Sequence, residues 1–555
     1  MNKKRLPKST YPNRYEIELD VDLDNFSYTG AQKVDLNVVE ATNNIVLNSV
    51  GIEVTKAKIQ TTKQDIPLEV NYIEEDEKIV FESQETLSEG VYELYLEFNS
   101  EITNDLKGFY KSSYMSEDGE KKWIATTQFE PTAARSAFPC WDEPEYKAIF
   151  SMTIITDEKY LRVSNEMVVE EEKVENNKLR TKFADSMKMS SYLVAFVIGD
   201  LEATVVGKSK TTDIRIIHRP GFSHQTSYAG TAAIKLLDFF EDYYKIPYPG
   251  TKLDLIAIPD FAMGAMENVG AVTFRENLLL FDKDKATRSE LDRSITVIAH
   301  ELAHMWFGDL VTMKWWDGIW LNEAFASLME VIASYNTYPE FKQWNAMNMS
   351  RTAGFSIDSL ENSRPVEFDV ETPDQAEEMF DVLTYEKGST VLRMFQMFIG
   401  EEAFQNGVEA YLNKFKFENT NSSDLWDALS EASNQPLNKI LPFWIREKGY
   451  PFLQVDCSNN FLTIKQKPFL LKNVETDKNN IKPVPVQIKF LDTGNEEKFL
   501  LDETERVIDL KNLGEVPHIN SGGWGFFHTF YDDEVFENIL ANFDKLNDLE
   551  KYRLL

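Results

Sequence analysis

Cysteine and histidine are scarce in this chain, and long uncharged apolar runs are missing from it. Its 555 residues include two cysteines and six histidines. Two cysteines exclude a disulfide framework, and no CxxC pair exists. No segment approaches the ~20 apolar residues of a membrane helix. The opening MNKKRLPKSTYPNRY lacks the apolar core of a secretory signal. These absences favour a cytoplasmic protein.

A surplus of basic residues is also missing. Aspartate and glutamate number 92 against 58 lysines and arginines, so the formal net charge is −34. Such a surface repels nucleic acid and anionic membranes, and we predict neither as a partner. The charge could favour cationic groups, such as the N-terminal amine of a peptide, or could serve solubility alone.

The length predicts three or four domains at roughly 100–200 residues each. Residues 1–207 alternate apolar and polar side chains, which is typical of strands with one buried face. Residues 208–449 mix helices with a strand and hold every chemically suggestive side chain. Residues 450–530 alternate again and predict a small β-sandwich. Residues 531–555 turn helical. The expected fold class is therefore multidomain α+β.

Local patterns predict several elements of these domains. Tyr15 to Leu23 and Tyr92 to Phe98 read as strands, and acidic segments at Glu117–Lys122 and Glu170–Lys173 read as turns. A helix is predicted to end before Pro247, followed by a strand at Leu253–Ile258.

The segment Ser289–Phe307, SELDRSITVIAHELAHMWF, predicts a buried helix. Ser289 is a plausible N-cap with Asp292 three residues on, and Gly308 is a natural stop. Apolar residues at spacings of three and four form one stripe along it, namely Leu291, Ile295, Ile298, Leu302 and Met305.

His300 and His304 lie away from that stripe. Their i, i+4 spacing puts two imidazoles on one helix face, one turn apart, where both can bind one metal ion. Glu301 stands beside the first ligand and can act as a general base on a water molecule. This is the H-E-x-x-H pattern, whose chemistry is metal-assisted hydrolysis.

A third ligand is available from a second predicted helix, Trp320–Ser334. Glu323 on this helix follows His304 after the eighteen residues 305–322, enough for a loop and a turn back. Two imidazoles and one carboxylate with an open fourth position suit zinc. We therefore predict one zinc ion per chain, bound by His300, His304 and Glu323.

With these motifs the chain resembles the M1 family of zinc aminopeptidases, the gluzincins, and most closely their puromycin-sensitive and endoplasmic-reticulum branches. The family's G-A-M-E-N signature stands at Gly264–Asn268. Thr127–Pro144, TQFEPTAARSAFPCWDEP, is similar to its N-terminal-domain segment beside the site. Leu383–Gly388, LTYEKG, carries its catalytic tyrosine. The resemblance implies an N-terminal β-saddle, a thermolysin-like catalytic domain, a small β-sandwich and the start of a helical domain.

The resemblance also implies roles for individual residues. Glu267 and Glu130 would bind the α-ammonium of the substrate, so that only a peptide with a free N-terminus fits. Gln128 and Met263 would line the first subsite. Tyr385 would stabilise the oxyanion. The substrate would lie against the signature segment, which comprises Gly264, Ala265, Met266, Glu267 and Asn268.

The implied activity is a zinc aminopeptidase of peptide catabolism, and three other functions compete with it. A zinc endopeptidase would have no use for the Glu267 clamp. An epoxide hydrolase with aminopeptidase activity would have glycine where this chain has Ala265. An inactive peptide-binding module would not need every catalytic residue type.

The family's large C-terminal helical domain is represented here only by its start. The chain could be a fragment, the missing part could be a second chain, or the enzyme could work with an open cleft. We favour the fragment.

Overall fold

The computed structural model describes residues 5–60, 64–471 and 481–554. The chain divides into two compact units. The first contains Met1–Trp316, Glu371–Glu377 and Phe415–Thr420, and the second contains Asp317–Val370, Glu378–Lys414 and Asn421–Leu555.

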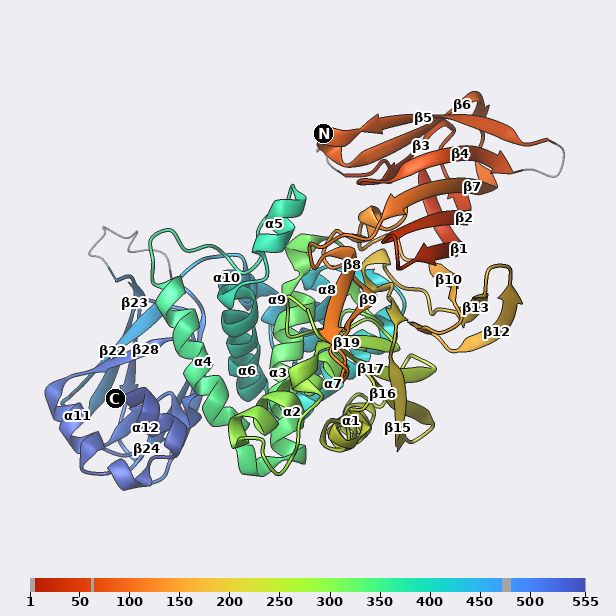
Figure 1. Cartoon of the computed structure of the whole chain (residues 1–555). Helices are drawn as coiled ribbons and strands as arrows, with labels where there is room; N and C mark the ends of the chain where they lie inside the picture. Colours follow the sequence, from red (N-terminus) through yellow and green to blue (C-terminus); the bar gives the residue numbers. More distant parts are fainter. Residues whose placement is uncertain (1–4, 61–63, 472–480, 555) are drawn as a thin grey trace. The chain divides into compact units, whose positions relative to one another are not determined.

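The first unit opens with a ten-stranded sheet (Figure 1). Apolar and polar residues alternate along its strands as predicted. In the strand Thr10–Asp22, Tyr15, Ile17 and Leu19 are each at most 1% exposed, while Glu16 between them is exposed. In spatial order the strands are β12 (Val168–Val174), β13 (Lys178–Asp185), β10 (Ile149–Asp157), β1 (Thr10–Asp22), β2 (Ser27–Val38), β7 (Gly90–Glu101), β4 (Glu53–Gln60), β5 (Ile66–Ile73), β6 (Lys78–Leu87) and β3 (Thr42–Asn48).

The predicted turn at Glu170–Lys173 is wrong, because these residues lie inside β12. This strand stands at the edge of the sheet, where both of its faces are open to solvent. Charged side chains are well tolerated on such an edge and also discourage pairing with other chains. The acidic run therefore marks an exposed strand rather than a break.

The first unit also contains two smaller sheets of four and five strands. One has the order β11 (Leu161–Ser164), β14 (Phe196–Gly199), β9 (Lys121–Gln128) and β8 (Gly108–Met115). The other has the order β15 (Glu202–Ser209), β16 (Thr212–His218), β17 (Lys252–Ile258), β19 (Ala271–Arg275) and β18 (Ala265–Met266). The central β17 is buried along its whole length between two parallel neighbours, which explains its largely apolar sequence, and its two charged residues, Lys252 and Asp254, form an ion pair at 2.7 Å.

Helices α1 (Ser227–Tyr244) and α2 (Arg288–His304) pack against each other in the same unit. Helix α1 ends three residues before Pro247, as predicted, with Lys245 in the left-handed conformation. The chain beyond α2 forms β20 (Thr312–Met313), which pairs in parallel with β21 (Asn419–Thr420).

The second unit begins with helices. Helix α3 (Trp320–Thr337) contains the second predicted helical segment and packs against α4 (Gln343–Asp358), α6 (Gly388–Ile399) and the π-helix Leu383–Lys387. The remaining helices of this unit are α7 (Glu401–Phe415), α8 (Ser422–Ser433), α9 (Leu437–Ile440) and α10 (Pro442–Ile445), whereas nearly all of α5 (Pro373–Glu378) belongs to the first unit.

The later part of this unit contains two sheets (Figure 1). One has the order β26 (Glu505–Asp509), β23 (Phe461–Phe469), β22 (Tyr450–Ser458) and β28 (His528–Tyr531), and the other β25 (Glu496–Leu501), β24 (Val484–Phe490) and β27 (Pro517–Ile519). Helices α11 (Asp533–Leu540) and α12 (Asp548–Leu554) follow. A small apolar core joins Val535 and Ile539 of α11 to Leu491 and Val516.

None of the helices in the described part of the chain is long and apolar enough to span a bilayer.

Candidate active site

Helix α2 carries the first part of the site. Its N-cap is Thr287, whose hydroxyl accepts from the Glu290 backbone N–H while the Glu290 carboxylate accepts from the Thr287 backbone N–H. The predicted cap at Ser289 is therefore wrong by two residues, because a threonine with glutamate at the third helical position forms the full capping box. The helix ends at His304, short of the predicted Phe307.

The two histidines of α2 approach each other edge to face. Their Nε2 atoms are 3.1 Å apart, and their ring centroids are 4.7 Å apart with an interplanar angle of 74°. The Nδ1 atom of His304 lies 2.9 Å from the carbonyl oxygen of Phe307. A carbonyl can only accept, so Nδ1 carries the proton and Nε2 keeps its lone pair for a metal.

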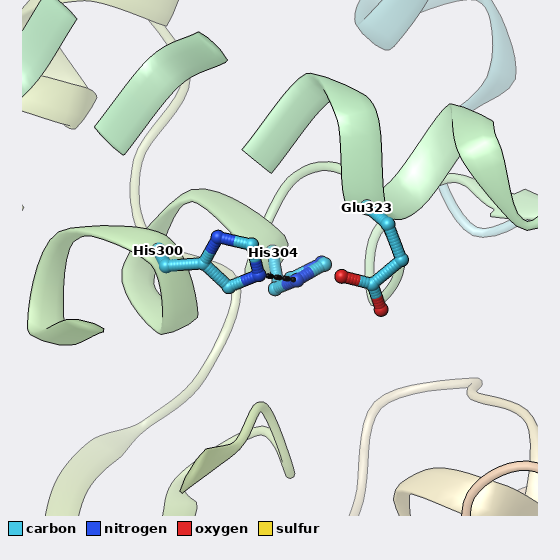
Figure 2. Close-up of side chains that lie close together, drawn as sticks. All are labelled: His300, His304 and Glu323. Atoms are coloured by element: carbon cyan, nitrogen blue, oxygen red, sulfur yellow. Dashed lines mark hydrogen bonds between the residues drawn. The ribbon is translucent and has the colours of Figure 1, made fainter. Parts of the chain in front are cut away.

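Glu323 near the start of α3 completes a group that could hold a metal ion. One ligand atom from each of His300, His304 and Glu323 lies within 4.8 Å of the other two, and Figure 2 shows the Glu323 carboxylate beside the facing rings. Two atoms each about 2.1 Å from one tetrahedral zinc ion would lie about 3.4 Å apart. The spacing and the donor types therefore both fit a zinc site.

The general base predicted between the histidines is buried. Glu301 is 4% exposed and follows His300 on α2. A carboxylate so far removed from solvent costs several kcal/mol unless charged or polar groups surround it. Its role as the general base that activates a water molecule stays a prediction from the H-E-x-x-H pattern.

The loop after α2 is fixed by side chains that the sequence patterns did not single out. Lys147 Nζ donates to the backbone carbonyl oxygens of Asp309, at 3.0 Å, and Leu310, at 3.2 Å. The Tyr192 hydroxyl donates to the Gly308 carbonyl at 3.2 Å. Burial lowers the pKa of Lys147 to about 7, and burial together with the Glu267 charge raises the pKa of Asp309 well above its usual range.

The signature segment Gly264–Asn268 forms the edge of the five-stranded sheet. Among the described strands, β18 pairs with β19 alone, through Ala265 opposite Phe274 and Met266 opposite Thr273. An edge strand presents unpaired backbone groups to which an extended peptide can add. The binding of substrate at this edge stays a prediction.

Two carboxylates meet beside this edge. Glu130 follows β9, Glu267 follows β18, and a carboxylate oxygen of each lies within 4.8 Å of the other. Both are buried, at 9% and 3% exposure. Glu267 Oε1 is 3.8 Å from His304 Nδ1. The carboxylate pair therefore borders two of the predicted metal ligands, His304 and Glu323, whose carboxylate also lies within 4.8 Å of both glutamates.

The predicted lining residues of the first subsite differ in their exposure. Gln128 is buried, and its amide nitrogen lies 3.4 Å from the sulfur of Met266. Met263 is 44% exposed on the loop before β18. A Cβ at Gly264 would meet other atoms only at 3.9–4.0 Å, so the chain itself leaves room at this position.

The segment is held from both ends by residues outside the signature. Arg275 donates to the carbonyl oxygens of Phe261 and Ala262, at 3.2 and 2.7 Å. The Asn165 amide donates to the Val269 carbonyl at 2.9 Å. Gly270 has φ +75° and lies so close to the Asn165 carbonyl that a Cβ would clash at 2.0 Å, so only glycine fits here.

Tyr385, the predicted oxyanion stabiliser, lies in the π-helix Leu383–Lys387 of the second unit. Such single-turn π-helices are frequent at functional sites. A fully buried ion pair, 2.8 Å between Lys387 Nζ and Asp358 Oδ2, anchors the end of this turn to α4. The role of Tyr385 stays a prediction.

Comparison with known proteins places this site in a family. The description "Peptidase M1 N-terminal domain" matches residues 11–193, and "Peptidase family M1 domain" matches residues 228–444. The chain is 37% identical to Aminopeptidase M1-A of Oryza sativa subsp. japonica and 38% identical to Aminopeptidase M1 of Arabidopsis thaliana, over 99% of its length in both cases. It is 37% identical to the puromycin-sensitive aminopeptidase of Caenorhabditis elegans over 97% of its length.

The chain belongs to peptidase family M1, which confirms the resemblance predicted from its motifs. It spans 64%, 65% and 58% of the lengths of these three relatives. The predicted domain boundaries and the cytoplasmic location stay predictions.

Proposed function

We propose that this protein is a zinc-dependent aminopeptidase that hydrolyses the first peptide bond of peptides with a free N-terminus. The observation that carries the proposal is the pair of buried carboxylates, Glu130 and Glu267, bordering His304. Two buried carboxylates so close together are stabilised as anions by a cation, and the α-ammonium of a peptide would supply one at the correct end of the substrate.

His300, His304 and Glu323 would hold one zinc ion. The fit rests on their donor types, on their spacing within 4.8 Å and on the Phe307 carbonyl that fixes the His304 tautomer. Zinc at such a site supplies Lewis-acid activation of water and of the scissile carbonyl.

Two side chains carry out the proton transfers and the charge stabilisation. Glu301 takes the proton from the attacking water and passes it to the leaving amine as the peptide bond breaks. Tyr385 donates a hydrogen bond to the oxygen that becomes negative during the attack. The backbone of β18 aligns the peptide, and the carboxylate pair fixes its amino end.

The Glu130–Glu267 pair argues against the rival functions. An endopeptidase must admit chain on both sides of the scissile bond, and a buried anionic pair disfavours a neutral peptide group at that position. The relatives named above are called aminopeptidases, which favours the exopeptidase. Ala265 argues against the epoxide hydrolase. An inactive binding module is disfavoured because each required catalytic side-chain type is present.

The decisive experiment compares one peptide with a free amino end and the same peptide N-acetylated. The purified chain should release the first residue from the free peptide only, and a zinc chelator should abolish that release. Cleavage of both peptides at an internal bond would identify an endopeptidase instead. If the zinc-loaded protein cleaved neither peptide, the result would favour an inactive peptide-binding module.

A further inference from the structure

A pocket of about 300 Å³ lies in the second unit, and none of the residues of the proposed reaction lines it. Its wall comes from β28, α11 and α12, which Figure 1 labels, and from the chain around β27. A cavity of about 150 Å³ can hold benzene, and ligand pockets commonly begin near about 300 Å³. The pocket therefore has room for a ligand with one ring and a short polar chain.

One part of the wall is aromatic. Phe527, Tyr531 and Phe536 line the pocket, and Phe530 beside them is 66% exposed. The Tyr531 hydroxyl is already occupied, because it accepts from the Ile519 backbone N–H at 2.9 Å and donates to the Ile519 carbonyl at 3.3 Å. These rings therefore offer apolar faces and edges, which favour an apolar and preferably aromatic group.

The wall also contains a cation, Arg553 on α12. Its Nη2 atom donates to the Phe527 carbonyl at 3.4 Å and lies 3.3 Å from His528 Nδ1. Its guanidinium lies 4.4 Å from the centroid of the Phe355 ring. The Nε atom is enclosed, whereas Nη1 donates to no group in the described part of the chain. Nη1 is therefore the nitrogen that remains for a ligand.

The positive charge of Arg553 has no acidic partner. Across residues 5–60, 64–471 and 481–554, its guanidinium forms no ion pair. A second cation adds to the imbalance, since the buried Arg351 guanidinium lies 6.0 Å from the same Phe355 centroid. Burial lowers the pKa of Arg553 to about 10, so it stays protonated at neutral pH. A partly desolvated cation of this kind favours an anionic ligand.

Asp533 limits how much negative charge that ligand can carry. It is an exposed residue in the first turn of α11 and lines the same pocket. A carboxylate in the wall repels a second negative charge on the ligand. A monocarboxylate therefore fits this pocket better than a phosphate monoester or a dicarboxylate.

We propose that this pocket binds a small aryl-substituted monocarboxylate. The carboxylate accepts from Nη1 of Arg553, and the ring packs against Phe527 and Phe536. The bound molecule would join β28, α11 and α12. Binding here uses none of the residues of the proposed reaction and does not depend on the peptidase activity.

The test is isothermal titration calorimetry of the zinc-loaded full chain with 3-phenylpropionate as the probe. Binding should be saturable. The alcohol 3-phenylpropan-1-ol has the same ring and chain length without the charge, so it should bind about 10–100-fold more weakly. Phenyl phosphate should also bind more weakly. An excess of zinc chelator should leave the affinity for 3-phenylpropionate unchanged, which separates this pocket from the proposed zinc site.

Three variants locate the binding. Arg553→Gln should weaken 3-phenylpropionate about 10–100-fold through the loss of the charged contact. Arg506→Gln, an arginine of the same unit that does not line the pocket, changes the net charge equally and should keep the full affinity. Asp533→Asn should bind the probe at least as tightly and should narrow the difference between 3-phenylpropionate and phenyl phosphate.

A crystal soaked in 3-(4-bromophenyl)propionate should show an anomalous bromine peak between Phe527 and Phe536, which tests the site even if Arg553→Gln fails to fold. Absence of saturable binding would overturn the proposal. Equal affinity for the acid and the alcohol, or an affinity that the chelator removes, would overturn it as well. A bromine peak found only outside this pocket would do the same.

Discussion

Lys147 donates a 3.0 Å hydrogen bond to the backbone carbonyl of Asp309, 162 residues further along the chain. Lys147 belongs to the segment that leads into β10, and Asp309 to the loop that follows His304. The contact joins the part of the chain matched by the N-terminal family description to the loop behind a predicted metal ligand. It explains why that loop is buried and ordered around the helix end.

Replacing Lys147 with methionine should destabilise the protein and change how its stability depends on pH. The substitution leaves two buried carbonyls without a donor, at a cost of about 1–3 kcal/mol. The folded pKa of Lys147 is about 7, below its unfolded value of 10.5. Its contribution is therefore fully present above pH 10.5 and is lost as the pH falls to 7. Between pH 7 and pH 9 the free energy of unfolding in urea should increase less for Lys147→Met than for the control Lys33→Met, at an exposed lysine of the same unit.

Glu301→Gln should abolish turnover without releasing the metal. Glutamine keeps the size of the side chain but cannot accept a proton, and general base catalysis typically contributes about 10²–10⁴-fold. Metal content should be measured beside kcat on an aminoacyl-coumarin. Glu290→Gln on the same helix, at an exposed position, should keep activity. Loss of zinc together with activity would instead make Glu301 part of the metal site.

Tyr385→Phe should fold normally and lose about 10²–10³-fold in kcat, as expected for the loss of one oxyanion donor. The KM should change little, because the hydrogen bond forms mainly in the transition state. Steady-state kinetics on one unblocked substrate give both constants. A kcat close to that of the unaltered protein would remove Tyr385 from the mechanism.

Glu267→Gln should reduce kcat/KM for peptides with a free amino end by about 10–100-fold, the loss of one charge-assisted contact. N-acetylated peptides carry no ammonium, so any residual cleavage of them should be unchanged. The measurement is therefore the ratio of kcat/KM for the free peptide to kcat/KM for the N-acetylated peptide. An unchanged ratio would show that Glu267 does not recognise the amine.

Acid should destabilise the second unit through His528. Burial and the charges of Arg553 and Arg351 lower the pKa of His528 from 6.5 to about 4. Its contribution to stability is present above pH 6.5 and is lost as the pH falls toward 4, because the unfolded state binds the proton first. His528→Phe keeps the ring stacked on Phe355 and should flatten this part of the pH profile. Urea midpoints between pH 7 and pH 4 test this, with the exposed His224→Gln as control.

Many of the candidate site residues could be predicted because they belong to motifs whose residues are close together in the sequence. The i, i+4 pair of His300 and His304 needs only one helix to become a metal-binding pair. The alternation from Tyr15 to Val21 likewise fixes which face of β1 is buried. Errors arose where two local signals competed: Thr287 rather than Ser289 caps α2, and the acidic residues of β12 lie on an edge strand rather than in a turn.

Short-range patterns were enough to predict a metal-binding pair, a neighbouring base and the signature segment, because each prediction depends on residues within a few turns or strand positions of one another. Only the folded chain shows that Lys147 supports the loop after His304 and that Asn165 and Gly270 fix the end of the signature segment. These contacts join residues far apart in the chain. Their free energy comes from burial and from pairing in the folded state, and no local pattern encodes either.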